Sequence, residues 1–161
     1  MSSTPEFDII VYGATGYTGR LVAEYLSQEY ADDSGLRWAM AGRSQSKLEA
    51  VRDEINAPAD TPLVVADTGD ADSLRAMAER TRVVLTTVGP YQLYGSDLVR
   101  ICAETGTDYV DLCGEPAWMR QMIDAHGETA KQSGARIVFS CGFDSIPFDL
   151  GVYFLQQAAQ E

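Results

Sequence analysis

The sequence has few basic residues for its size and only one histidine. Lysine and arginine total 12 against 24 aspartates and glutamates, so the net charge is −12 at neutral pH and the pI is near 4.3. Nucleic acids and anionic membrane surfaces are bound through a basic face, and this balance argues against both as partners. The length of 161 residues and the hydrophobic content of 45% predict one globular domain.

Paired cysteines and long apolar runs are also absent. The three cysteines, Cys102, Cys113 and Cys141, form no C-x-x-C pair, and the polar N-terminal segment MSSTPEFD lacks the character of a signal peptide. These features predict a reduced, cytoplasmic protein, and we assign no metal site. No apolar run approaches the ~20 residues that a membrane-spanning helix needs, so we expect no membrane span.

Three glycines at every third position mark the segment VYGATGYTGR, residues 11–20. An apolar run precedes them and a pattern with helical period follows, which predicts a strand, a turn and a helix whose start suits a phosphate. Gly13 then permits the tight turn, Gly16 lets the backbone approach a pyrophosphate, and Gly19 lets the helix pack close to the strand. The spacing differs from the commoner G-x-G-x-x-G, so an ordinary glycine-rich turn is the alternative.

Short apolar runs alternate with longer helical patterns along the rest of the chain. Six strands are predicted, over residues 8–12, 37–41, 63–66, 83–87, 108–112 and 136–139. Ser46 and Glu49 have capping-box spacing at the start of one helix, and Pro116 opens another that ends near Gly134. The alternation predicts an α/β fold with a doubly wound parallel sheet, most simply in the order 3-2-1-4-5-6, with ligands at the carboxyl ends of the strands.

The second strand ends in AGRS, residues 41–44, where an NAD enzyme usually carries an acidic residue for the ribose 2′-hydroxyl. Arg43, with Ser44 and Lys47, could instead make charge-assisted hydrogen bonds to a 2′-phosphate. Arg20 could add to the same positive field. This pattern favours NADP, and the alternative is a solvated arginine beside a helix-capping serine.

Two later strand ends also carry candidate cofactor contacts. Asp67 follows the third strand, where its carboxylate either meets the adenine edge or stabilises a turn or helix start. The fourth strand leads into TTVGPYQLYG, residues 86–95, at the expected reversal of strand order. We expect Gly89 and Pro90 to form a stiff backbone beside the nicotinamide ribose, with Tyr91 nearby. A turn in which the tyrosine only packs is the alternative.

The last two strand ends contain acidic residues whose roles are open. Asp111 and Cys113 share one face of the fifth strand, and a carboxylate that binds neighbouring loop N–H groups is favoured over one that takes part in chemistry. After the sixth strand, Asp144 and Ser145 are candidate caps for a helix that Pro147 opens. His126, the single histidine, is expected on the solvated surface.

Five motifs, GATGYTG, AGRS, VGPYQLYG, YVDLCGE and GFDSIPFDLG, occur in an order that resembles the N-terminal half of the saccharopine dehydrogenase-like oxidoreductases, and the trans-acting enoyl reductases are similar. The resemblance covers residues 8–151. It implies a Rossmann domain over residues 1–161 that prefers NADP to NAD. The implied cofactor contacts are Gly13, Ala14, Thr15, Gly16, Tyr17, Thr18, Arg43 and Ser44, with Gly89, Pro90 and Tyr91 near the nicotinamide.

Members of this family continue into a substrate-binding domain, and this chain ends within a segment of helical pattern, residues 148–160. We therefore expect the cofactor-binding part of an NADP-dependent oxidoreductase, inactive alone, with its C-terminal substrate domain absent. Hydride would pass between NADP(H) and a C=O, C=N or C=C carbon of an unknown small molecule. The catalytic residue is unassigned, with Tyr91, Asp144 and Cys141 as candidate proton donors. The oligomeric state is left open, with a homodimer as one possibility.

Two other interpretations share the fold. A non-catalytic module could bind NADP and report its redox state to a partner. An S-adenosylmethionine-dependent methyltransferase is also doubly wound, but the ribose of that ligand is usually held by an acidic residue after the second strand. Arg43 at this position argues against the methyltransferase.

Overall fold

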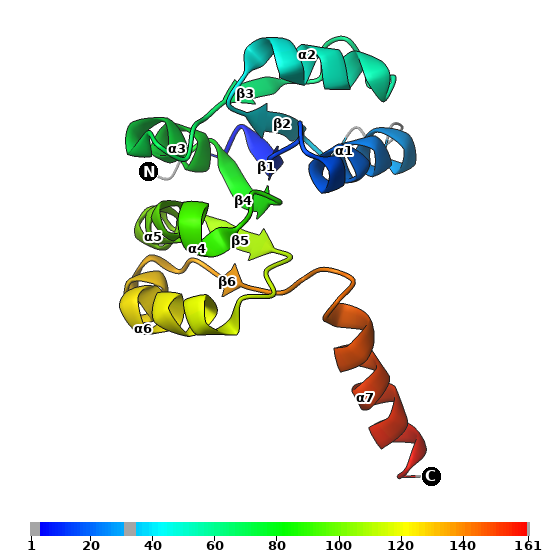
Figure 1. The fold of residues 1–161 in the computed structure, drawn as a ribbon, viewed down its shortest axis with the longest axis vertical. Helices are drawn as coiled ribbons and strands as arrows, with labels where there is room; N and C mark the ends of the chain where they lie inside the picture. Colours follow the sequence, from blue (N-terminus) through cyan, green and yellow to red (C-terminus); the bar gives the residue numbers. More distant parts are fainter. Residues whose placement is uncertain (1–3, 31–34, 161) are drawn as a thin grey trace.

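Six parallel strands form one sheet in the computed structural model, which describes residues 4–30 and 35–160 (Figure 1). Residues 1–3 of the polar N-terminal segment lie outside the described residues. The strand order is β3-β2-β1-β4-β5-β6, so the predicted fold and order are confirmed. The strands are β1 (Phe7–Tyr12), β2 (Trp38–Gly42), β3 (Leu63–Val65), β4 (Thr81–Thr86), β5 (Asp108–Asp111) and β6 (Ile137–Val138).

Helices cover both faces of this sheet. The helices of the described chain are α1 (Tyr17–Glu29), α2 (Gln45–Glu54), α3 (Ala71–Ala78), α4 (Tyr91–Tyr94), α5 (Ser96–Thr105), α6 (Pro116–Ser133) and α7 (Ile146–Ala158). Helices α1 and α2 pack on one face, whereas α3, α5 and α6 pack on the other (Figure 1). None of the helices in the described part of the chain combines the length and apolar character that crossing a bilayer requires.

The central strand β1 explains why the sheet is buried on both sides. Ile10 and Tyr12 lie in the core beneath α3 and α5, whereas Val11 lies in the core beneath α1 and α2. Side chains alternate along a strand, so a strand covered on both faces must be apolar at every position. The uninterrupted apolar run at residues 9–12 is the consequence. Strand β1 pairs with β2 on one side and with β4 on the other.

The turn from β1 to α1 depends on two glycines. Gly13 has a φ of +93°, a conformation that L side chains rarely adopt. Gly19 lies in the first turn of α1, and a Cβ on it would be 2.1 Å from the carbonyl oxygen of Gly13. The helix can therefore approach the strand end this closely only because Gly19 has no side chain.

The start of α2 differs from the sequence prediction. Ser44 is the capping residue, and its Oγ accepts a hydrogen bond from the Lys47 N–H at 3.4 Å, so the predicted capping box of Ser46 and Glu49 is wrong. Ser44 still has the extended backbone of the strand end, which leaves its hydroxyl free to meet the first turn. Ser46 already lies within that turn, and the Glu49 carboxylate accepts from the Gln45 side chain instead.

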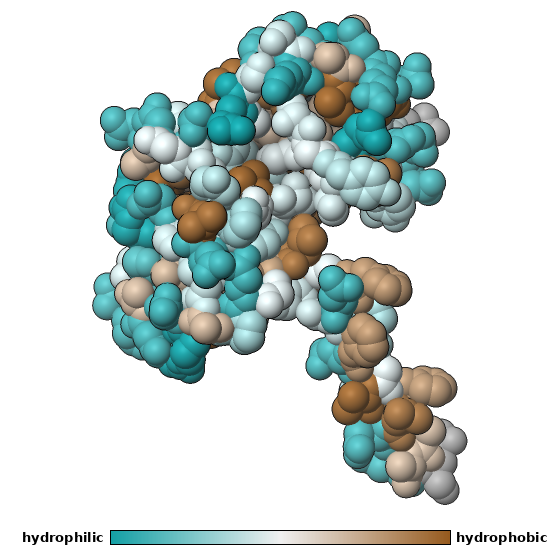
Figure 2. Space-filling view, viewed as in Figure 1, coloured by the Kyte–Doolittle hydropathy of each residue, from teal (hydrophilic) through white to brown (hydrophobic). Residues whose placement is uncertain are grey.

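The predicted helix from Pro116 to a glycine stop is confirmed as α6, and Pro147 opens α7 as expected. The expected caps of α7 are absent among the described contacts, because neither Asp144 nor Ser145 makes a capping side-chain hydrogen bond. Helix α7 buries none of its residues and extends away from the sheet (Figure 1). Figure 2 shows apolar side chains along it, and the exposed ones include Phe148, Leu150, Val152, Tyr153, Phe154 and Leu155.

Candidate functional site

A cavity of about 270 Å³ opens at the carboxyl ends of β1, β2 and β4. Four segments contribute its lining: the glycine turn after β1, the end of β2, the loop after β3, and the residues from the end of β4 to α4. The lining residues are Tyr12, Gly13, Thr15, Gly16, Gly42, Arg43, Thr68, Thr87, Val88, Gly89 and Tyr94. Strand order reverses between β1 and β4, and open parallel sheets bind their ligands at that point.

The N-terminus of α1 points its free backbone groups toward this cavity. Gly16 is the N-cap residue, and no side chain makes a capping hydrogen bond to the helix start. Gly16 also lines the cavity, with its backbone in the extended region at φ −83° and ψ 167°. The unpaired N–H groups and the positive end of the helix dipole together form a site suited to a phosphate group.

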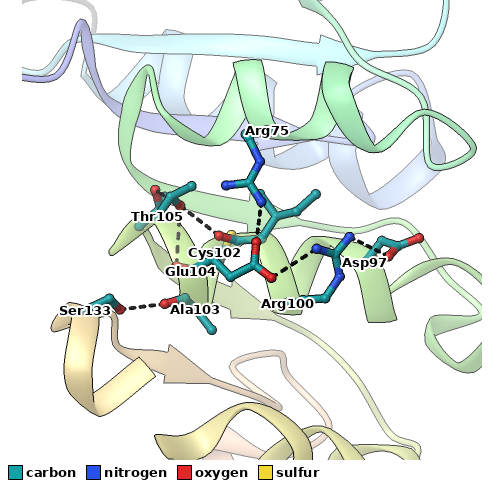
Figure 3. A network of polar contacts seen from close by, with 10 residues as sticks. Arg75, Asp97, Arg100, Cys102, Ala103, Glu104, Thr105 and Ser133 are labelled. Carbon is teal, nitrogen blue, oxygen red and sulfur yellow. Dashed lines mark hydrogen bonds and ion pairs between the residues drawn. The ribbon is translucent and has the colours of Figure 1, made fainter. Parts of the chain in front are cut away.

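Nearly all of the cations on this protein are already paired with carboxylates. Of the 12 lysines and arginines, ten form ion pairs within the described residues: Arg20, Arg37, Arg52, Arg75, Arg80, Arg82, Arg100, Arg120, Lys131 and Arg136. Figure 3 shows one such network, in which Arg75 and Arg100 share the Glu104 carboxylate. Arg43 and Lys47 are the two cations for which the described part of the chain offers no carboxylate partner.

Both unpaired cations lie at the junction of β2 and α2, and Arg43 lines the cavity. Arg20 does not join them, because its Nη1 lies 2.6 Å from Oε1 of Glu54. The charge of Arg20 is thus neutralised by an acidic residue at the end of α2, and Arg20 is not among the residues that line the cavity. An arginine without a carboxylate partner on a chain of net charge −12 is a local positive centre in a negative surface.

Five of the residues expected to contact the cofactor line the cavity, namely Gly13, Thr15, Gly16, Arg43 and Gly89. The others do not. Near the glycine turn, Ala14 is buried, and Tyr17 and Thr18 are exposed at the start of α1. At the start of α2, Ser44 is the capping residue and Lys47 is exposed. After β4, Pro90 precedes α4 and Tyr91 is buried. Asp67 accepts a hydrogen bond from the Gly69 N–H at 2.8 Å, which is the turn-stabilising alternative for that carboxylate.

Tyr91 packs rather than facing the cavity. Its hydroxyl donates to the Thr86 carbonyl at 3.2 Å and accepts from the Leu112 N–H at 3.4 Å, and its ring lies 5.7 Å from that of Trp118. Burial raises the pKa of this phenol above its usual value of 10. The geometry agrees with the alternative in which the tyrosine of this loop stabilises the turn.

Asp111 connects three segments at the carboxyl end of the sheet. One carboxylate oxygen accepts from the backbone N–H groups of Cys113 and Ser140, at 3.0 and 2.8 Å, and the other accepts from the Tyr109 hydroxyl at 2.8 Å. Burial is the largest influence on this carboxyl group and raises its pKa. The favoured interpretation, a carboxylate that binds loop N–H groups, is confirmed.

The other candidate proton donors lie outside the cavity lining. The Cys141 thiol is directed at the carbonyl groups of Val138 and Phe139, and burial raises its pKa, which favours the protonated thiol. Asp144 is exposed in the loop before α7. His126 is half-buried rather than solvated, and it lines a separate apolar cavity of about 240 Å³ between α6 and β6.

Several site residues were missed in the sequence. Tyr94 and Thr68 line the cavity, and the Glu115 carboxylate accepts from the N–H groups of Tyr91 and Gln92 at 2.8 and 2.9 Å. Glu115 could have been identified from the sequence, because it is an acidic residue that follows a predicted strand and directly precedes the helix-opening Pro116. Nothing in the spacing distinguished Tyr94 from Tyr91.

Known proteins match this chain over most of its length. Residues 9–138 match the family described as saccharopine dehydrogenase NADP binding domain. Trans-acting enoyl reductases from Mycobacterium leprae and Mycobacterium ulcerans are 52% and 50% identical over 97% and 99% of this chain. The matched regions are only 37% and 38% of those proteins, so the chain spans well under half the length of the curated relatives it matches.

Solved structures show the same fold at low identity. Saccharopine dehydrogenase (L-Glu forming) from Saccharomyces cerevisiae has a TM-score of 0.74 at 15% identity, over 96% of this chain and 32% of that one. Triphenylmethane reductase from Citrobacter sp., complexed with NADP(H), has a TM-score of 0.56 at 17% identity, over 83% of this chain and 48% of that one. The family match includes the glycine turn and the Arg43 loop, and the chain therefore belongs to the saccharopine dehydrogenase NADP-binding domain family, with NADP as its cofactor.

Proposed function

We propose that this chain is the cofactor-binding part of a reductase. It binds NADP(H) and presents the nicotinamide for hydride transfer to a C=O, C=N or C=C carbon of a small-molecule substrate. The observation that carries the proposal is the position of Arg43, an arginine without a carboxylate partner in the described chain, within a cavity at the reversal of strand order. NADPH would supply the hydride when bound and become NADP+, and the chain would supply orientation and charge.

The proposed contacts follow the order of groups in the cofactor. Arg43, with Lys47 nearby on α2, would bind the 2′-phosphate at the end of β2, because no acidic residue is among those that line the cavity. Gly13, Gly16 and the start of α1 would hold the pyrophosphate. Val88 and Gly89, after β4, would then lie beside the nicotinamide ribose.

We expect Arg43→Ala to weaken NADP binding by roughly 10- to 150-fold and to leave NAD binding nearly unchanged. A charge-assisted hydrogen bond is worth about 1.5 to 3 kcal/mol, which corresponds to that range. The 2′-phosphate is the group that distinguishes the two cofactors. The measurement is calorimetric titration of both cofactors into both proteins at one ionic strength, because salt screens exposed charge contacts.

Arg82→Ala is the matched control for this substitution. Arg82 lies at the amino end of β4, where it faces Asp8 at 3.6 Å, so its replacement changes the net charge equally at the opposite end of the sheet. NADP affinity should be unaffected by the control. The proposed contact of Arg43 with the 2′-phosphate would be contradicted if Arg43→Ala lost affinity for NADP and NAD equally. A preference of the unchanged protein for NAD would contradict it as well.

The substrate would be held by a second domain that packs on α7. Two observations support this part of the proposal: the relatives are more than twice as long as the matched region, and α7 exposes apolar side chains along its length. Large apolar side chains exposed together in this way are typical of a surface that another domain or protein covers. Tyr94, which lines the cavity, is 46% exposed.

We expect residues 1–161 alone to bind NADPH without turning over carbonyl, imine or enoyl compounds. A reaction site needs walls around the substrate as well as the cofactor, and this chain provides only the cofactor side. The assay is the loss of NADPH absorbance with representative substrates of each class, beside a binding titration. Sustained turnover by this chain would contradict the two-domain proposal.

A non-catalytic NADP-sensing module is the second candidate. It is favoured by one observation, that the candidate proton donors Tyr91, Asp144 and Cys141 all lie outside the cavity lining. Hydride transfer by a longer protein that contains this chain would exclude the sensing role as its sole function. The cytoplasmic location stays a prediction, and the oligomeric state stays open.

A further inference from the structure

Tyr94 occupies the end of the cavity that lies beyond β4. The cavity lining contains two tyrosines, Tyr12 and Tyr94. Tyr12 is buried, and its hydroxyl donates to the Ala66 carbonyl at 3.4 Å, so this phenol is part of the core. Tyr94 is 46% exposed, and its hydroxyl makes no hydrogen bond within the described residues. Tyr94 therefore contributes to the cavity lining an aromatic ring whose hydroxyl has no hydrogen-bond partner in the described part of the chain.

The short helix that carries Tyr94 is held at three points. The Glu115 carboxylate accepts from the first two N–H groups of α4, and the buried Tyr91 hydroxyl is bonded to the Thr86 carbonyl. At the other end, a Cβ on Gly95 would lie 2.7 Å from the Trp118 ring, so α4 and α6 are in close contact there. The Tyr94 backbone is thus fixed relative to the cavity before any ligand arrives.

We propose that the Tyr94 ring packs against the nicotinamide ring of NADP(H). The inference rests on the proposed function, which places the nicotinamide at the end of β4 beside Val88 and Gly89. An aromatic side chain provides a flat apolar surface for a flat heterocycle, and a side chain on a backbone that is already fixed has less conformational entropy to lose on binding. Tyr94 is on this basis a cofactor-binding residue at the reacting end, and the ring rather than the hydroxyl carries the contact.

The test compares two ligands that share the adenosine and the 2′-phosphate. NADPH contains the nicotinamide, whereas adenosine 2′,5′-bisphosphate contains only the adenosine and the 2′-phosphate. We expect Tyr94→Ala to weaken NADPH binding about fivefold or more, the low end of aromatic stacking on a base, and to leave the bisphosphate unaffected. Tyr94→Phe should bind both ligands like the unchanged protein. Both affinities are measured by calorimetry on the 161-residue chain.

Leu93→Ala is the matched control, because Leu93 is a 68% exposed neighbour on the same helix that does not line the cavity. It should leave both affinities unchanged. Three outcomes would each overturn the inference. Tyr94→Ala could lose affinity for NADPH and for the bisphosphate equally, or it could lose no affinity for NADPH. Tyr94→Phe could also lose as much affinity for NADPH as Tyr94→Ala does. If the unchanged chain binds neither ligand, the proposed function itself fails, which separates the two cases.

Discussion

Gly19→Ala is expected to lower the free energy of unfolding by about 3 kcal/mol or more, the upper end of the usual cost of overpacking. The added Cβ would lie 2.1 Å from the Gly13 carbonyl oxygen and 2.8 Å from the Thr87 hydroxyl. The nearest obstacle is backbone, which cannot rotate away as the end of a side chain can. Helix α1 must therefore shift away from β1, with loss of packing against Val11. Urea unfolding followed by circular dichroism measures the effect.

Gly127→Ala is the control for this prediction. Gly127 lies inside α6, and a Cβ on it would meet no atom within 4 Å. Alanine favours the helix over glycine by about 0.8 to 1 kcal/mol, so this variant should be slightly more stable than the unchanged protein. An unchanged urea midpoint in Gly19→Ala would show that α1 does not approach the strand as closely as the structure describes.

Gly16→Val is expected to abolish dinucleotide binding while the fold persists. The backbone at Gly16 is in the extended region that valine adopts readily, and the new Cβ would lie 3.3 Å from the Gly13 oxygen, a tight but tolerable contact. The side chain would fill the space in which the proposed pyrophosphate contact is made. The loss of two charge-assisted hydrogen bonds at about 1.5 to 3 kcal/mol each corresponds to a fall in affinity of roughly 150-fold or more.

The same replacement at Gly114 supplies the control. Gly114 is exposed in the loop before α6, outside the cavity lining, and has open space where a Cβ would lie. Calorimetric titration with NADP and NAD, beside circular dichroism, separates binding from folding. Unchanged affinity in Gly16→Val would mean that the three glycines form an ordinary turn.

The arrangement of strands could be predicted because few topologies satisfy the pattern. Six apolar runs separated by helical segments require right-handed crossovers, and the glycine turn after the first run identifies the central strand. The apolar residues Ile10 and Val11 had to face opposite cores. Helix boundaries were less certain, since Ser44 and Ser46 are both good caps, and the choice depended on where the backbone leaves β2.

The site was predictable where backbone geometry defines it and not where side-chain direction does. Gly13 and Gly16 could be placed at the cavity from their spacing alone, and Arg43 from its position after a strand. Tyr91 and Tyr94 occur three residues apart in one motif, and the sequence prediction named Tyr91, whereas Tyr94 lines the cavity. Their directions depend on how α4 is oriented, and that orientation is held by Glu115, 24 residues away from Tyr91.

Helix α7 lacks the support that stabilises the other long helices. It has 13 residues, none of them buried, and no side chain makes a hydrogen bond at its N-cap. Isolated helices of about 12 to 15 residues are marginal in water, because nucleation is costly and only propagation along the segment offsets it. In the 161-residue chain, α7 is therefore governed by a local helix–coil equilibrium, and its amide hydrogens should exchange with solvent far faster than those of β1. Packing of another domain on α7 would couple that equilibrium to global unfolding. The helix and the domain packed on it would then unfold as one cooperative unit.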